Sequence, residues 1–230
     1  ITVHHQSFFY PATGVRYGSK LHLAFGAGER NNPVGSDAEY DDGLDSNNNH
    51  YYVVRDDNPL EGSGTPPDPI TDAYAESDLA DFDAPSQMSC TQMKSTKQGY
   101  FITGRDAEKF ITNSLVFLGD VFTASFVPPD PDDTASVCAS AGDSYLYRFD
   151  LECGVGAFLS EPGGPAEKRR RAIGSGVPTR PRVSVGCLNQ GGGSGCKNKV
   201  VVITSDASIE NIDSGNAASS GIKIRAWRDR

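Results

Sequence analysis

Residues 145–154 read Tyr-Leu-Tyr-Arg-Phe-Asp-Leu-Glu-Cys-Gly, and this stretch decides the fold class. Large apolar side chains recur at alternate positions as far as Phe149, which is the period of a β-strand. Asp150 and Gly154 then supply residue types that favour a turn. The stretch therefore predicts a β-strand that ends in a turn.

The same arrangement recurs along the chain, where short apolar or alternating runs lie between turn-forming clusters and helical periodicity is almost absent. This pattern predicts an all-β protein with antiparallel strands. Leu118-Gly119 predicts a tight hairpin between two of the strands. Strands are expected at residues 21–27, 50–55, 99–103, 114–118, 121–127, 144–151, 181–185, 199–204 and 221–227.

The charge of the 230-residue chain is concentrated in one part of it. The formal net charge is −9, but residues 29–83 alone hold 15 acidic and 2 basic side chains. Residues 84–230 are close to neutral, with 15 acidic and 17 basic side chains. The acidity argues against a general nucleic-acid binder, which needs a basic surface. No apolar run reaches the ~20 residues of a membrane-spanning helix.

Long stretches between the strands are rich in Asp, Pro, Gly and Ser. We expect irregular insertions near residues 35–48, 56–89, 128–143 and 160–180. The last contains the basic run Lys168-Arg-Arg-Arg171, for which a solvated loop is the expectation. Long loops on a β scaffold are either functional or disordered.

The five cysteines lack the C-x-x-C spacing of a zinc or redox motif. Cys187 and Cys196 bracket a glycine-rich loop, and Cys138 and Cys153 flank a predicted strand, so these two pairs are candidate disulfides. Cys90 would then pair outside this segment. Five free thiols are the alternative. Disulfides favour an extracytoplasmic setting.

Catalytic signals are poor. The chain has no G-x-S-x-G nucleophile elbow, and Ser, His and Asp lack the arrangement that would indicate a triad. His22 is interpreted as a structural or solvent-facing residue on a strand, rather than as a base. We therefore expect no enzymatic activity, no catalytic residue and no cofactor-binding residue.

One acidic stretch has the residue types of a cation site. Its carboxylates alternate with other residues, as oxygen ligands do when a loop wraps Ca²⁺. The stretch lacks the closing glutamate of an EF-hand, and a solvated acidic insertion is the competing interpretation. The candidate ligands are Asp37, Glu39, Asp41 and Asp45.

Several segments together resemble a known family. Residues 21–33, Leu-His-Leu-Ala-Phe-Gly-Ala-Gly-Glu-Arg-Asn-Asn-Pro, and the strand at 49–56 are similar to a blade and its returning strand in type IV pilus biogenesis and tip-associated adhesins of the PilY/PilC type. Residues 107–126, which begin Ala-Glu-Lys-Phe, resemble the next blade, and residues 138–151 its closing strand. Ala27 replaces the family's usual threonine, and the insertion at 35–48 is longer and more acidic than in the family.

The resemblance implies a partial β-propeller with quinoprotein-like blades and long insertions, so that residues 1–230 form the C-terminal part of a propeller domain. Blades need about four strands each, and the expected strands suffice for two to three. The remaining blades are expected from preceding sequence of the same protein.

The implied function is that of a non-enzymatic adhesin at the bacterial surface, pilus tip or outer membrane. Its expected partners are the remainder of the propeller, minor or major pilins, and a host or abiotic surface, with no nucleic acid. The alternatives are a quinoprotein-like propeller dehydrogenase, disfavoured by the single Trp227, and a secreted structural domain stabilised by Ca²⁺.

Overall fold

The computed structural model places most of the described residues in β-sheets that are largely antiparallel, which confirms the all-β class. In the part of the chain that the structure describes, one short α-helix and one turn of 3₁₀ helix interrupt the strands. No helix among the described residues is long and apolar enough to cross a membrane. The structure describes residues 8–30, 49–57, 59, 74–82, 88–105, 107–129, 141–159, 167–188, 195–205 and 209–213.

The first sheet holds five strands in the order β1-β2-β3-β5-β4. Neighbours are antiparallel except β4, which runs parallel to β5. The 3₁₀ turn η2 precedes β4, and α1 lies between β4 and β5. The bounds are β1 Thr13–Tyr17, β2 Lys20–Gly26, β3 His50–Asp56, η2 Glu76–Asp78, β4 Ala80–Asp81, α1 Cys90–Thr96 and β5 Gly99–Thr103.

The second sheet is a four-stranded meander in the order β6-β7-β8-β11, entirely antiparallel. A two-residue turn joins β6 to β7, with positive φ at Leu118 (56°) and Gly119 (87°). The predicted hairpin is therefore confirmed. The hairpin of β9 and β10 lies between β8 and β11 in sequence. The bounds are β6 Leu115–Phe117, β7 Asp120–Val127, β8 Asp143–Asp150, β9 Phe158–Leu159, β10 Glu167–Lys168 and β11 Arg170–Ser175.

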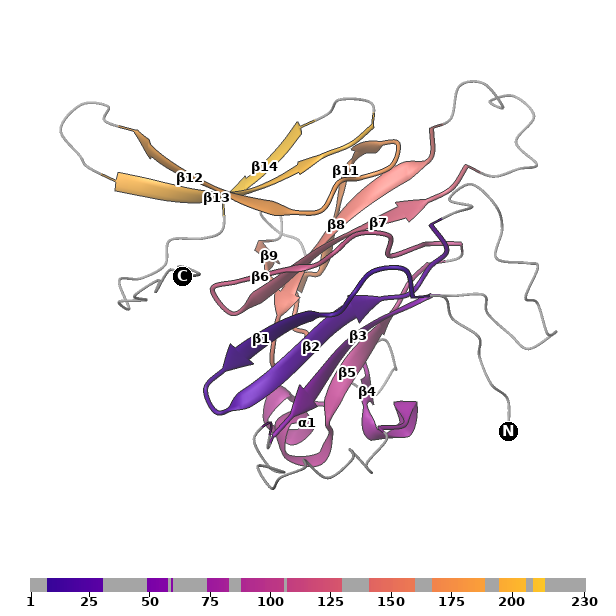
Figure 1. Ribbon diagram of the computed structural model, residues 1–230, viewed down its shortest axis with the longest axis vertical. Coiled ribbons are helices and arrows are strands. Elements are labelled where there is room, and N and C mark those ends of the chain that lie inside the picture. The colour runs from indigo at the N-terminus through magenta and orange to yellow at the C-terminus, as the bar shows by residue number, and fades with distance from the viewer. Residues whose placement is uncertain are drawn as a thin grey trace, which may run out of the picture.

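The third sheet is a shorter antiparallel meander, ordered β12-β13-β14. Figure 1 shows it at the top of the molecule, with the second sheet beneath it and the first sheet at the bottom. Its strands are β12 Arg182–Leu188, β13 Gly195–Ile203 and β14 Ile209–Asp213.

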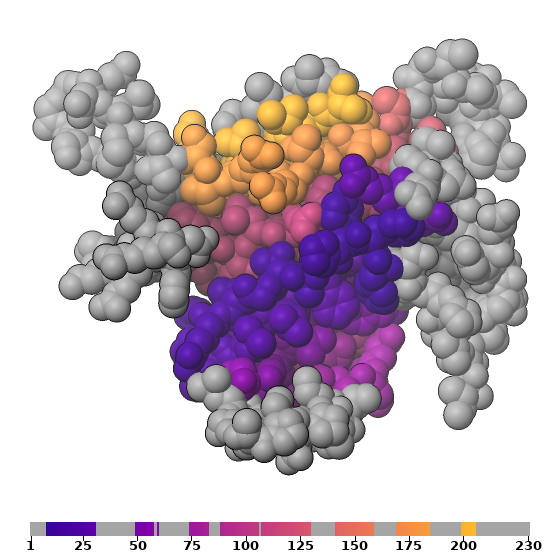
Figure 2. Space-filling view, viewed as in Figure 1, coloured from indigo at the N-terminus to yellow at the C-terminus, as the bar shows by residue number. Residues whose placement is uncertain are grey.

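Two hydrophobic cores hold the three sheets in a stack, because the second sheet is apolar on both faces. One core lies between the first and second sheets, where Tyr51 and Tyr100 meet Phe149. The other lies between the second and third sheets, where Phe122 and Leu146 meet the buried valines of β13. In the space-filling view the three sheets follow one another in chain order from indigo to orange (Figure 2).

The first strands of two successive sheets also meet at their edges. β1 lies beside β6, and the Thr13 hydroxyl donates a 3.0 Å hydrogen bond to the carbonyl of Ser114, just before β6. The second sheet therefore begins close to where the first sheet began.

The expected insertions need correction where strands run through them. The stretch near 160–180 is not an irregular insertion throughout, because β11 is an edge strand of the second sheet. The stretch near 56–89 contains η2 and β4. Its residues 58, 60–73 and 83–87 lie outside the described residues, as do the insertion at 35–48 and the predicted strand at 221–227.

Candidate functional site

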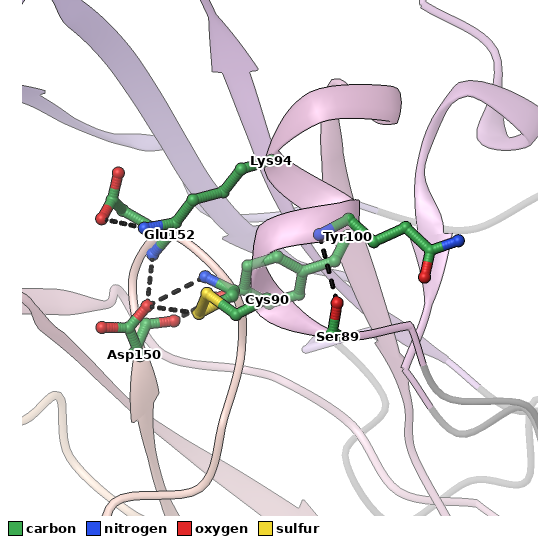
Figure 3. Close-up of a disulfide and its surroundings, with 8 residues drawn as sticks. Ser89, Cys90, Lys94, Tyr100, Asp150 and Glu152 are labelled. Carbon is green, nitrogen blue, oxygen red and sulfur yellow. Dashed lines mark hydrogen bonds and ion pairs between the residues drawn. A yellow bond between two sulfur atoms is a disulfide. The ribbon is translucent and has the colours of Figure 1, made fainter.

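The disulfide of the described chain joins Cys90 to Cys153, whose Cα atoms lie 5.2 Å apart (Figure 3). The predicted pairing of Cys138 with Cys153 is therefore wrong, and so is the expectation that Cys90 pairs elsewhere. Cys138 lies outside the described residues. Cys90 is the first residue of α1, and this end of the helix lies beside the turn after β8 that contains Cys153. The sequence pattern did not reveal α1, so it could not reveal this pairing.

The turn that carries Cys153 is itself held by hydrogen bonds. One carboxylate oxygen of Asp150 accepts from the backbone N–H groups of Glu152 and Cys153, each at 2.9 Å. The hydroxyl of Tyr100 donates to the carbonyl of Asp150 at 2.8 Å. Gly154 has φ +64°, and a Cβ there would lie 2.8 Å from the Tyr100 ring. The predicted Asp-to-Gly turn is thus confirmed, and it fixes the position of Cys153.

Arg55 anchors the other end of α1 to the first sheet. Its side chain is buried, and one terminal nitrogen donates to the carbonyls of Lys94 and Lys97, both at 2.9 Å. Its Nε donates to Asp57 at 2.8 Å. Carbonyls at a helix C-terminus lack partners within the helix, so a guanidinium satisfies them. Sequence reasoning placed Arg55 in a strand without assigning it this role.

A fully buried carboxylate, Glu108, lies between the first and second sheets. Ser125 and Tyr147 donate to it from neighbouring strands, the Tyr147 hydroxyl at 3.0 Å from both oxygens. The backbone N–H of Arg105 donates at 2.8 Å, and the guanidinium of Arg170 lies 3.5 Å away. Because a buried charge is tolerated only when it is paired and hydrogen-bonded, this network is structural.

The two segments that carry the family resemblance meet beside Glu108. A Cβ on Gly26 would lie 2.3 Å from the Cβ of Phe110, and one on Gly28 would lie 2.8 Å from the Cβ of Lys109. The N–H of Phe110 donates to the carbonyl of Ala27 at 2.9 Å. Because Gly26 and Gly28 lack a Cβ, the backbone of the Glu108-Lys-Phe110 segment can pack directly against them. The sequence alone did not indicate this contact.

The basic run at 168–171 is not a simple solvated loop. The guanidinium of Arg169 lies 4.4 Å from the ring centroid of Phe82 and donates to its carbonyl at 3.2 Å. The guanidinium of Arg170 lies 4.4 Å from the ring centroid of Tyr145 and faces Glu108. The cation–π contact thus holds Arg169 against Phe82, just after β4 of the first sheet. The ion pair with the buried Glu108 holds Arg170 in the second sheet.

The calcium prediction falls on residues that the structure does not describe. Asp37, Glu39, Asp41 and Asp45 all lie in residues 31–48. Within the described ranges, no group of three or more His, Cys, Asp or Glu side chains is placed to hold a metal ion. The Ca²⁺ site stays a prediction.

The candidate pair Cys187 and Cys196 lies in β12 and β13, where the two residues are direct partners in the antiparallel register. Their side chains lie outside the described residues. Directly opposed cysteines of adjacent strands bring their Cα atoms within the range that a disulfide requires. This disulfide stays a prediction, and the backbone register is compatible with it.

The charged groups described above organise the fold. Glu108 orders the contact between two sheets, and Arg55 and the disulfide tie α1 to both. The sequence offered one signal for Glu108, a charged Glu-Lys pair directly before an apolar run. It offered none for the partners that reach Glu108 from distant strands.

Comparison of the chain with protein-family models, with curated proteins and with solved structures finds no match.

Proposed function

We propose that the chain forms consecutive blades of a β-propeller in a non-enzymatic bacterial surface adhesin associated with type IV pili. The observation that carries this proposal is the stack of three meander sheets, of which the middle one is covered on both faces. A propeller is built from four-stranded antiparallel sheets that follow one another along the chain around a central axis.

The order of the strands supports this reading. In each sheet the antiparallel strands follow one another in chain order from one edge, and only the short β4 and the β9–β10 hairpin interrupt them. The chain then leaves β5 and returns to start the second sheet at β6, beside β1. In a propeller the first strand of each blade lines the central axis. The first strands of neighbouring blades must therefore lie side by side, as β1 and β6 do.

The outer face of the first sheet supports a further blade. Leu21, Leu23 and Phe25 of β2 point away from the first core, and Phe25 stacks with Tyr52 at 5.5 Å between ring centroids. Phe8 packs on both rings. A sheet with one solvated face alternates apolar and polar residues, whereas this sheet is largely apolar on both. The proposed occupant is the remainder of the same propeller.

The third sheet differs in the character of its outer face. Arg182, Ser184 and Lys199 are exposed there beside Ile203, whereas Val200 and Val202 are buried on the inner face. The proposal therefore places the additional blade against the first sheet.

The Cys90–Cys153 disulfide supports an extracytoplasmic location. Disulfides persist in the periplasm and at the cell surface and are rare in the cytosol. In this proposal the rigid sheets present the segments between strands to pilins and to host or abiotic surfaces.

An adherence assay tests the function. The purified chain is immobilised on beads, and the adherence of the beads to epithelial cells and to polystyrene is compared with that of an unrelated all-β protein of similar charge. We expect higher adherence for the chain. A variant with residues 31–48 replaced by a Gly-Ser linker is expected to adhere less, while melting at the same temperature as the unaltered chain when both are measured with a calcium chelator.

Two outcomes would contradict the proposal. Adherence equal to that of the unrelated protein on every surface would remove the adhesive function. Binding of a quinone, seen as its absorbance after gel filtration, would favour the dehydrogenase instead.

Calcium remains part of the proposal, with Asp37, Glu39, Asp41 and Asp45 as ligands. A ligand that binds only the folded state raises its stability. We therefore expect 1 mM Ca²⁺ to raise the melting temperature and a chelator to lower it. Replacement of the four residues by their amides should abolish the response, and an unchanged melting temperature in the unaltered chain would exclude a structural site.

A further inference from the structure

His22 is a buried histidine without a hydrogen-bond partner. It lies in β2 with its side chain directed at the second sheet, and only 1% of its surface is exposed. Neither Nδ1 nor Nε2 has a hydrogen-bond partner. The imidazole ring makes an edge-to-face contact with the ring of Tyr17, at 6.4 Å between ring centroids. Buried polar atoms are nearly always satisfied, so this ring requires an explanation.

The surroundings of His22 form a distinct region, which we call the α1 junction. It comprises His22, Arg55, helix α1, the Cys90–Cys153 disulfide and Glu152. Arg55 is the cross-strand partner of His22 and bonds the C-terminal carbonyls of α1. The disulfide and a 2.5 Å ion pair between Lys94 and Glu152 tie α1 to the turn after β8. The first and second sheets are therefore linked through this region.

The charges around His22 are already matched with one another. Asp57 lies 2.8 Å from both Lys20 and Arg55, and Glu152 is paired with Lys94. The charges that act on His22 are those of Glu152, Arg55, Lys20 and Asp57, and Lys94 of α1 pairs with Glu152. The carboxylate of Asp150, at the end of β8, is occupied by the backbone N–H groups of Glu152 and Cys153. A proton on His22 would add a positive charge next to Arg55, without a carboxylate left to pair with it.

We infer that His22 is an acid-sensitive switch, whose protonation loosens the α1 junction and increases the exposure of the Cys90–Cys153 disulfide, in which Cys153 is buried and Cys90 is partly buried.

The direction follows from linkage. Burial is the largest cause that lowers the pKa of His22 below its ordinary 6.5, while Glu152 raises it and Arg55 lowers it. The unfolded or opened state therefore binds a proton at higher pH than the closed state does. Stability is fully present above pH 6.5 and is lost as the pH falls toward the folded pKa. For each unit by which the pKa of His22 differs between the open and closed states, the equilibrium constant for opening can increase up to tenfold on acidification.

Reduction of the Cys90–Cys153 disulfide by a phosphine measures this opening directly. The rate is followed for the full chain by mass spectrometry between pH 7.5 and 5.5, and each rate is divided by that for oxidised glutathione. We expect the normalised rate to rise severalfold toward pH 5.5. Asp57 remains ionised over this window, because burial raises the pKa of its carboxyl less than the contacts with Lys20 and Arg55 lower it, and the net shift is downward.

Variants separate His22 from the other histidines. His22→Leu replaces an unpartnered ring with an apolar group of similar volume, and its rate should not change with pH. His50→Gln is the control, because His50 stacks on Phe101 at the outer face of the first sheet. It should retain the acid response. A response that persists in His22→Leu, or a flat profile in the unaltered chain, would overturn the inference.

A second measurement does not depend on a substitution. The ring protons of His22 can be followed by NMR as the pH is lowered, after assignment by comparison with His22→Leu or from the sequential connectivities of the unaltered chain. Titration of His22 below 6.5, together with loss of the α1 signals, is expected. A pKa of 6.5 or above for His22 would contradict the inference, because protonation would then not favour the open state.

Discussion

Glu108 shows how one side chain can decide the contact between two sheets. Its carboxylate is fully buried, and its side-chain partners come from three strands of the second sheet, β7, β8 and β11, while the backbone N–H of the nearby Arg105 also donates to it. The Ala-Glu-Lys-Phe motif could be recognised in the sequence. Its partners could not, because Ser125, Tyr147 and Arg170 reach it only after the second sheet has formed.

Glu108→Gln should destabilise the protein by about 2–4 kcal/mol, because it leaves the half-buried Arg170 without its counter-charge. Urea unfolding followed by circular dichroism measures the change. Asp143→Asn is the matched control, since Asp143 is exposed on β8, and it should alter the free energy of unfolding by less than about 0.5 kcal/mol. Equal effects of the two substitutions would show that the buried network contributes nothing.

Close packing at Gly26 is a second effect at the scale of single residues. Gly26→Ala should cost about 1–3 kcal/mol, because its Cβ would lie 2.3 Å from that of Phe110. Gly14→Ala serves as the control, where the new Cβ would meet Leu23 at an ordinary 3.6 Å. Thermal melting of both variants measures the difference. A tolerated Gly26→Ala would mean that the Glu-Lys-Phe segment can move away from β2.

At the scale of elements, strands with strong local patterns were predictable. The expected strands at 99–103 and 121–127 match β5 and β7 closely. The missed elements depend on distant partners. β11 begins with two arginines and resembles a loop until the guanidinium of the first, Arg170, meets Tyr145 and Glu108. Helix α1 is short, buries only Met93 and depends on Arg55 and the disulfide.

Removal of that disulfide tests what holds α1. Cys90 and Cys153 are separated by 63 positions, and a loop of that size contributes roughly 4 kcal/mol in the chain-entropy estimate. The double variant Cys90→Ala, Cys153→Ala should lose about 2–4 kcal/mol in urea unfolding. A matched double variant, Ser89→Ala with Ser95→Ala, alters α1 but leaves the bridge intact. It should lose about 1 kcal/mol, the usual contribution of an N-cap. An equal loss of unfolding free energy in the two double variants would mean that the disulfide stabilises the protein no more than the helix contacts of Ser89 and Ser95 do.

Mapping of disulfides tests the remaining cysteines. Proteolysis without reductant should give one linked pair of peptides containing Cys90 and Cys153, and a second containing Cys187 and Cys196. Cys138 should then react with a thiol reagent in the unfolded chain. A linked peptide containing Cys138 would require a different pairing.

At the scale of the whole molecule, the second sheet belongs to both cores, so the three sheets should unfold together. Phe122→Ala removes a fully buried ring between the second and third sheets and should cost about 3–5 kcal/mol. Far-ultraviolet circular dichroism and tyrosine fluorescence should give coincident urea transitions in this variant. Phe9→Ala is the control, because Phe9 is 40% exposed. Two separate transitions would indicate that the third sheet unfolds independently.

The stacking order of the sheets was only partly accessible from sequence. Apolar residues on both faces of β7 predict a strand that is covered on two sides. They do not identify the covering sheets, because any apolar face of suitable width would serve. That choice depends on chain connectivity, on the edge contact between β1 and β6, and on the close approach at Gly26.

The covalent bridge between α1 and β8 also has a mechanical consequence. Strands β5, β6, β7 and β8 all lie between Cys90 and Cys153, so tension along the backbone would pass through the sulfur atoms and bypass these strands. With ~3.5 Å per extended residue, the 63-residue separation withholds about 220 Å of contour length from stretching. A single-molecule pulling experiment should show this length only after a reductant is added.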